Sequence, residues 1–139
     1  MNIDLIIENA TKLEEENATK EKTVNFPRLE KLLGDGEVTI RTITPDELFA
    51  MQRKIKTTNQ IDYGIELSKL IIVKAVTNID FNNKELLNLF GVHKGTDVVL
   101  KLFNMQEVGA LADNIMTFSK LNNADVEVLE EAKVKKAKN

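Results

Sequence analysis

Cysteine and tryptophan are absent from this chain of 139 residues, and histidine occurs once. Without cysteine the chain has no disulfide framework, thiolate zinc site, iron–sulfur cluster or cysteine nucleophile. No glycine-rich phosphate loop is present, and the single His93 lacks a second histidine or a nearby fixed carboxylate to act with. The composition therefore predicts no enzymatic activity, no catalytic residue, no metal and no cofactor.

Long apolar runs are also missing from the sequence. Lys or Glu interrupts each run well short of the roughly 20 apolar residues that span a bilayer. The N-terminus has neither the basic start nor the apolar stretch of a signal peptide. We therefore expect a cytoplasmic protein that does not associate with a membrane, and the length predicts one compact domain.

Charge is distributed unevenly, around a formal net charge of −3. Residues 1–47 carry eleven acidic and six basic side chains, whereas residues 48–139 carry eleven acidic and thirteen basic ones. A nucleic-acid-binding protein usually has a basic stripe with aromatic residues or glycines set into it. The last four lysines have no arginine or aromatic companion, so we expect no nucleic-acid partner and a flexible, solvated tail over 122–139.

The N-terminal segment, residues 1–22, is amphipathic and then acidic. Its apolar residues occur at helical spacing and are followed by the run Glu14-Glu15-Glu16; they are Ile3, Ile6, Ile7, Ala10 and Leu13. One interpretation is a short amphipathic helix beside a mobile acidic linker. The other is a docking helix for a partner, because its apolar stripe is narrow for a core element.

A β-hairpin is predicted next. The runs 23–27 and 37–43 are separated by Gly34-Asp35-Gly36, and Val38 and Ile40 alternate with polar residues. We expect Gly34 and Gly36 to supply the positive φ of the connecting loop, and Pro27 to place the first strand at an edge. Gly-Asp-Gly is also compatible with an anion-binding nest, but no strand-to-helix phosphate loop follows it, which favours a turn.

Helix-start signals dominate the rest of the chain. Thr44, Asn82 and Asn104 each precede a glutamate by three residues, as in a capping box, and Asn59 is a weaker cap. The predicted helices cover 45–57, 60–77, 83–90, 96–103 and 105–120. Residues 70–73 alternatively form a strand, because three of the four are β-branched, but no turn signal separates them from the preceding helix.

The predicted fold class is therefore mainly α (α+β): a compact multi-helix domain with a small N-terminal β-hairpin and flexible termini. The hairpin and the helices form one unit over 23–121. The last helix has an apolar stripe at 3.6-residue spacing, and its Gly109 suggests close approach by another helix.

Residues from about 40 to 121 resemble the XkdN-like phage tail assembly chaperones. The similarity begins with a strand and a threonine-capped helix over 40–48. It continues through Asn78-Ile79-Asp80-Phe81, Glu85-Leu86-Leu87-Asn88-Leu89-Phe90-Gly91-Val92, Asp97-Val98-Val99-Leu100-Lys101-Leu102-Phe103 and Glu107-Val108-Gly109-Ala110-Leu111-Ala112-Asp113-Asn114-Ile115. The sequence departs from the family pattern at 104–106, where Pro-Gly often stands, and at Lys120, where glycine often ends the helix; residues 1–36 match only loosely.

The resemblance implies a non-catalytic helper of phage or prophage tail assembly in the host bacterial cytoplasm, absent from the mature virion. Its implied partners are the tape measure protein and the tail-tube protein, with self-association also possible. As contact residues we expect the apolar stripe of the first helix, through Leu5, Ile6 and Leu13, and exposed positions of the last helix, through Val108 and Met116.

Rival interpretations remain open from the sequence. A small helical adaptor that binds one phage or host protein requires the same core. A DNA-binding regulator requires a recognition helix with base-reading side chains, and the pair of helices over 83–103 offers only Lys101 near its end. An enzyme is the least favoured class.

Overall fold

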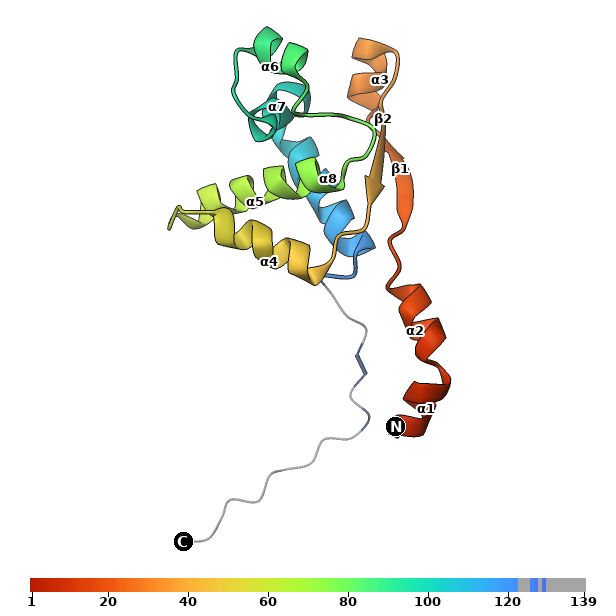
Figure 1. The fold of residues 1–139 in the computed structure, drawn as a ribbon. Coiled ribbons are helices and arrows are strands. Elements are labelled where there is room, and N and C mark those ends of the chain that lie inside the picture. The colour runs from red at the N-terminus through yellow and green to blue at the C-terminus, as the bar shows by residue number, and fades with distance from the viewer. Residues whose placement is uncertain (123–125, 128, 130–139) are drawn as a thin grey trace, which may run out of the picture.

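The computed structural model describes residues 1–122, 126–127 and 129 (Figure 1). Within them a two-stranded antiparallel sheet lies against a group of helices. The elements are, in chain order, α1 (Ile3–Glu8), α2 (Ala10–Glu16), β1 (Glu21–Asn25), α3 (Pro27–Leu33), β2 (Glu37–Arg41), α4 (Pro45–Lys54), α5 (Gln60–Ala75), α6 (Lys84–Phe90), α7 (Gly95–Leu102) and α8 (Met105–Phe118). The predicted class, mainly helical with a small N-terminal hairpin, is confirmed. The tail predicted over 122–139 lies almost entirely outside the described residues.

The hairpin is present, but its connection is a helix that the sequence analysis missed. β1 and β2 pair antiparallel with Val24 opposite Val38, and α3 fills the connection between them. Pro27 is the first residue of α3, where its missing N–H costs nothing. β1 is an edge strand as predicted, because the sheet has two strands, but Pro27 lies after it. Gly34 has a φ of 83° and forms the C-cap of α3.

Gly36 has a different role from the predicted one. Its φ is not positive, and a Cβ there would collide with the carbonyl oxygen of Phe26 and lie 2.9 Å from the amide nitrogen of Glu30. The glycine is needed because the start of α3 passes close to its backbone. Its carbonyl accepts a hydrogen bond from Phe26 N at 2.8 Å, which closes the connection.

The core lies where α5 crosses α8 and α7 beneath the sheet. Ile72 of α5, Ile115 of α8, Val99 of α7 and Ile40 of β2 are each fully buried. Residues 70–73 are helical, so the strand alternative is wrong. The buried residues of α5 are Ile71, Ile72 and Ala75, all in its second half, whereas Ile61 in its first turn is 75% exposed.

The cap signals predicted the helix starts well. Thr44 and Asn104 each form a complete capping box with the glutamate three residues later. Asn59 caps α5 and Asn83, rather than Asn82, caps α6. Asn82 instead accepts a hydrogen bond from Gly95 N at 2.9 Å, which ties the start of α6 to the start of α7.

The N-terminal segment forms two short helices outside the core. The acidic run over 14–16 is part of α2, so the prediction of a linker there is wrong. Every residue from 1 to 20 is exposed except Asn9, which is half-buried. A hydrogen bond from Thr42 N to the carbonyl oxygen of Lys20, at 2.9 Å, and one from Lys20 N to the Thr42 hydroxyl, at 3.0 Å, join the end of this segment to the body.

Candidate functional site

An apolar groove of about 490 Å³ runs between α3 on one side and α6 and α7 on the other. We define the apolar groove by its lining: Leu29, Leu33, Val38, Ile79, Leu86, Phe90, Val98 and Leu102, with Asp35, Gly36, Glu37 and Asn78 at its β2 end. Its floor is the core itself, since Val38 and Val98 are buried. Its only charged lining residues are the acidic Asp35 and Glu37.

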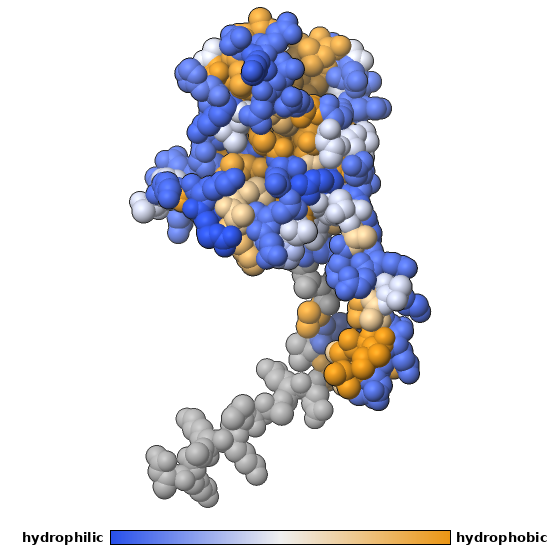
Figure 2. Space-filling model, in the orientation of Figure 1, coloured by the Kyte–Doolittle hydropathy of each residue, from blue (hydrophilic) through white to orange (hydrophobic). Residues whose placement is uncertain are grey.

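The rim of the apolar groove carries side chains that water meets directly. Leu33 is 66% exposed and Phe90 is 39% exposed, and Leu32 and Leu89 beside them are also exposed. Figure 2 shows apolar residues reaching the surface at this end of the body. Single exposed apolar residues are ordinary, but two in the lining of one apolar concave surface make it the candidate site for a protein partner; Leu32 and Leu89 lie outside that lining.

An arginine clamp holds one wall of the apolar groove in place. Arg28 of α3 donates two hydrogen bonds to Glu107 Oε1 of α8, at 2.9 and 2.7 Å, and one to the carbonyl oxygen of Leu102 at the end of α7, at 2.7 Å. The planar guanidinium therefore ties three helices together. α3 has no other polar side-chain link to the helical body among the described residues, apart from its contacts with the hairpin.

The electrostatics of the clamp favour the ionised carboxylate. Burial raises the pKa of Glu107, but the hydrogen bonds from Arg28 and from the Asn104 backbone outweigh it, and the net pKa is lowered. The same carboxylate completes the capping box of α8 through Asn104 N at 3.0 Å. One side chain thus both starts α8 and fixes α3.

The five predicted contact residues divide into two groups. Leu5, Ile6 and Leu13 are exposed at 52%, 44% and 47%, on α1 and α2, as the docking-helix interpretation requires. The expectation that Val108 is exposed is wrong, because it is 2% exposed, and Met116 is half-buried against the core. Since α8 has one apolar stripe and packs it on α5, that stripe is not free for a partner.

The sequence analysis did not find the apolar groove. Leu33 lies in the helix that it missed, and Phe90 had been interpreted only as part of a short helix. The pairs Leu32-Leu33 and Leu89-Phe90 give no such signal by themselves, because adjacent apolar residues of a short helix can both be buried, as Val98 and Val99 are in α7. Their meeting across one groove depends on the tertiary fold.

No cluster of side chains suited to catalysis or metal binding occurs in the described part of the chain. His93 is exposed in the loop between α6 and α7, and no group of three or more His, Asp or Glu residues converges there or elsewhere in residues 1–122. No helix among the described residues has the length and apolar character needed to cross a bilayer. The fold is that of a small, mainly helical protein with an apolar groove as its candidate binding surface.

A comparison with protein families identifies the family of this chain. The family model for the phage XkdN-like tail assembly chaperone protein matches residues 8–133, and the chain belongs to this family. It is therefore a non-catalytic tail assembly chaperone, which confirms the resemblance seen over residues 40–121 and extends it into the N-terminal part. No curated protein and no solved structure matches the chain.

Proposed function

We propose that this protein binds the tape measure protein in the host cytoplasm and keeps it soluble until the tail-tube protein polymerises around it. The observation that carries the proposal is the family match, and the apolar groove supplies the means of binding. A tape measure protein is a long helical chain with apolar faces, which aggregates unless those faces are covered. An amphipathic helix laid in a groove is the usual way to cover them.

The properties of the apolar groove restrict which helix it accepts. Leu33 of α3 and Phe90 of α6 both line the groove and offer apolar contact to a partner helix. Asp35 and Glu37 at the β2 end favour a partner segment with neutral or basic flanks and disfavour an acidic one. The groove is small, so each contact is weak, and many copies bound along one long target give reversible coverage.

The test is co-expression with the tape measure protein encoded in the same phage or prophage. We expect the wild-type chain to raise the soluble fraction of that protein and to co-purify with it in several copies. Leu33→Ser is expected to lower both, because it removes an apolar rim contact. Leu32→Ser is the matched control, since Leu32 has the same size and similar exposure on the same helix but does not line the groove.

The possible outcomes of this co-expression experiment distinguish the proposal from its alternatives. A tape measure protein that stays insoluble beside the wild-type chain contradicts the proposal. One copy bound per partner, or a different phage or host protein recovered in its place, identifies the helical adaptor instead. Equal effects of Leu33→Ser and Leu32→Ser would show that the partner binds outside the apolar groove.

A further inference from the structure

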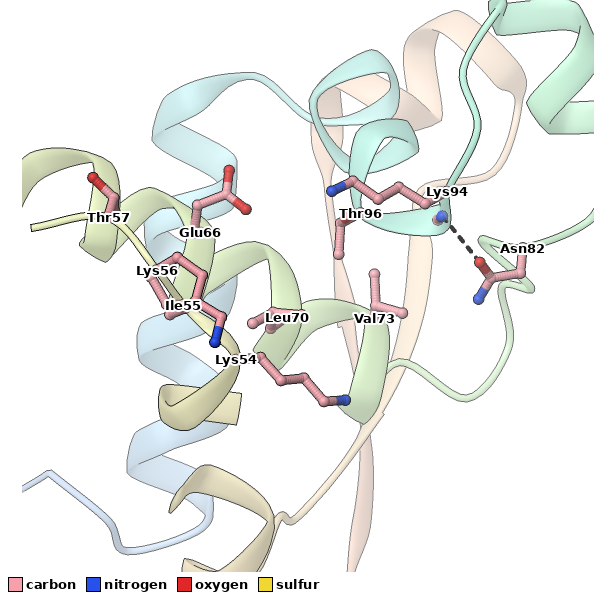
Figure 3. Close-up of a pocket in the computed structure, with 11 residues that line it drawn as sticks. Lys54, Ile55, Lys56, Thr57, Glu66, Leu70, Val73, Asn82, Lys94 and Thr96 are labelled. Carbon is pink, nitrogen blue, oxygen red and sulfur yellow. Dashed lines mark hydrogen bonds between the residues drawn. The ribbon is translucent and has the colours of Figure 1, made fainter. Parts of the chain in front are cut away.

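A second concave surface lies beside the middle of α5. It has a volume of about 440 Å³ and lies between the end of α4, the middle of α5 and the start of α7. We call it the lysine pocket, because Lys54, Lys56 and Lys94 line it around an apolar floor that includes Leu70 and Val73. In Figure 3, Lys54 and Lys94 lie on opposite sides of Leu70 and Val73.

The positive charge of the lysine pocket is not neutralised within the part of the chain that the structure describes. None of its three lysines forms an ion pair there. Its one carboxylate, Glu66, is paired with Lys69 at 2.8 Å. α7 begins at Lys94, and its first amide, Gly95 N, already donates to Asn82 Oδ1, so the positive charge of the pocket comes from its lysines. The pocket therefore suits an acidic segment with apolar side chains.

The N-terminal segment of this chain has that chemistry. Residues 1–17 carry five acidic side chains against one lysine. Ile3, Ile6 and Ile7 lie on α1 at the i, i+3, i+4 spacing of one helix face, and all three are exposed. No residue of α1 or α2 is buried, and helices of six and seven residues are not stable in water without a packing partner.

We propose that α1 and α2 of one copy dock in the lysine pocket of a second copy. The apolar groove is a poorer acceptor, because Asp35 and Glu37 repel an acidic segment. The end of α4 and the start of α7, which line the chain's own lysine pocket, lie away from the point where α2 meets the body (Figure 1). Lys20 and Thr42 hold that point by two hydrogen bonds, one of them to the Thr42 hydroxyl, and Glu16 pairs with Lys120 at 3.5 Å.

Segment and pocket are different surfaces, so the contact is heterologous. Each copy keeps a free pocket at one end and a free segment at the other, and copies add head to tail. This self-association does not depend on the proposed binding of a tape measure protein, because it uses a different surface. In this proposal Ile6, which the sequence predicts to contact a partner, contacts the second copy of the chain.

The test is sedimentation velocity on the full-length chain over a range of concentrations and salt. We expect the wild-type chain to form oligomers at low salt that dissociate as salt rises, because the lysine contacts are exposed to solvent. Lys54→Glu with Lys94→Glu, and separately Ile6→Ser with Ile7→Ser, are each expected to weaken association at least about tenfold. Lys31→Glu with Lys84→Glu is the matched charge control, since these exposed lysines do not line the pocket.

Mixing the two variants is the decisive step. The first keeps an intact segment and the second keeps an intact pocket, so a head-to-tail contact predicts a 1:1 heterodimer from two monomeric variants. A wild-type chain that stays monomeric at all concentrations overturns the proposal, whether the segment is free or docked in its own pocket. Oligomers that the variants leave unchanged, or a mixture that stays monomeric, overturn it equally.

Discussion

Glu47 joins more interactions than any other carboxylate described above. Its two carboxylate oxygens accept hydrogen bonds from the Arg41 guanidinium at 3.1 and 2.8 Å, one oxygen also closes the capping box of α4 at Thr44 N, and Lys74 lies 3.6 Å away. The hydrogen bond from Arg41 is the main reason why the pKa of Glu47 falls from 4.5 to about 2. A single side chain thus links β2, α4 and α5.

Acid is therefore expected to weaken the fold through Glu47. Because its pKa is lower in the folded than in the unfolded protein, its contribution is fully present above pH 4.5 and is lost as the pH falls toward 2. Glu47→Gln is expected to cost about 1–2 kcal/mol at pH 7, allowing for partial solvent exposure, and less at pH 2.5. Urea unfolding at both pH values measures this. An equal cost at both contradicts the assignment; Asp46→Asn, on the exposed side of the same helical turn, is the control.

Glycines in the interior of helices offer a second test at the scale of the residue. Nothing lies within 4 Å of a Cβ placed on Gly109 of α8 or on Gly64 of α5, so the predicted close approach of a helix at Gly109 is wrong. Gly109→Ala and Gly64→Ala are each expected to stabilise the protein by roughly 0.5–1 kcal/mol, because alanine loses less backbone entropy on folding. Gly36→Ala is expected to destabilise it, because its Cβ collides with the start of α3. Thermal unfolding compares the three, and a stabilising Gly36→Ala would refute the packing described here.

At the scale of the element, α3 depends on Arg28. Its side chain supplies the polar connection from α3 to α7 and α8, while Leu29 supplies the buried apolar contact. Arg28→Ala is expected to cost about 1–2 kcal/mol, because it leaves the largely buried Glu107 without its charged partner. Arg28→Lys is expected to recover only part of this, since an ammonium cannot reproduce the forked geometry.

Hydrogen exchange locates the effect of these variants. Arg28→Ala is expected to speed amide exchange in α3 more than in α5, because α5 keeps its apolar packing. Arg53→Ala on the exposed side of α4 serves as the control. Uniform acceleration over the whole chain would mean that α3 is part of the global folding unit and not a wall held by one clamp.

How far the sequence predicts these elements depends on what defines each one. Caps are local, so Thr44 and Asn104 locate the starts of α4 and α8 directly. The same kind of signal existed for α3, with Pro27 at its first position and Gly34 at its end, but the alternation of flanking residues favoured a hairpin loop. The apolar groove and the lysine pocket are not local: Leu33 and Phe90 come to line one groove, and Lys54 and Lys94 one pocket, only after the helices have packed.

For the whole molecule, the three apolar surfaces have different charge environments. The apolar groove has acidic residues at one end, the lysine pocket has a basic rim, and the N-terminal segment is acidic. Like charge keeps α1 and α2 out of the groove, and opposite charge directs them to the pocket. A chain that joins copies through one pair of surfaces while leaving the groove free is suited to cover a long target repeatedly.

This separation predicts that binding of a tail partner and self-association fail independently. Leu33→Ser is expected to leave oligomerisation unchanged while it lowers co-purification of a tape measure protein, since Leu33 lines only the groove. Lys54→Glu with Lys94→Glu is expected to abolish oligomers. It is also expected to reduce the number of copies bound per partner without abolishing binding of the first copy. Sedimentation and the stoichiometry of the purified complex measure both effects on the same proteins. If either variant abolishes both partner binding and self-association, the independence of the two surfaces is contradicted. That result is expected if the groove binds its partner only within the oligomer.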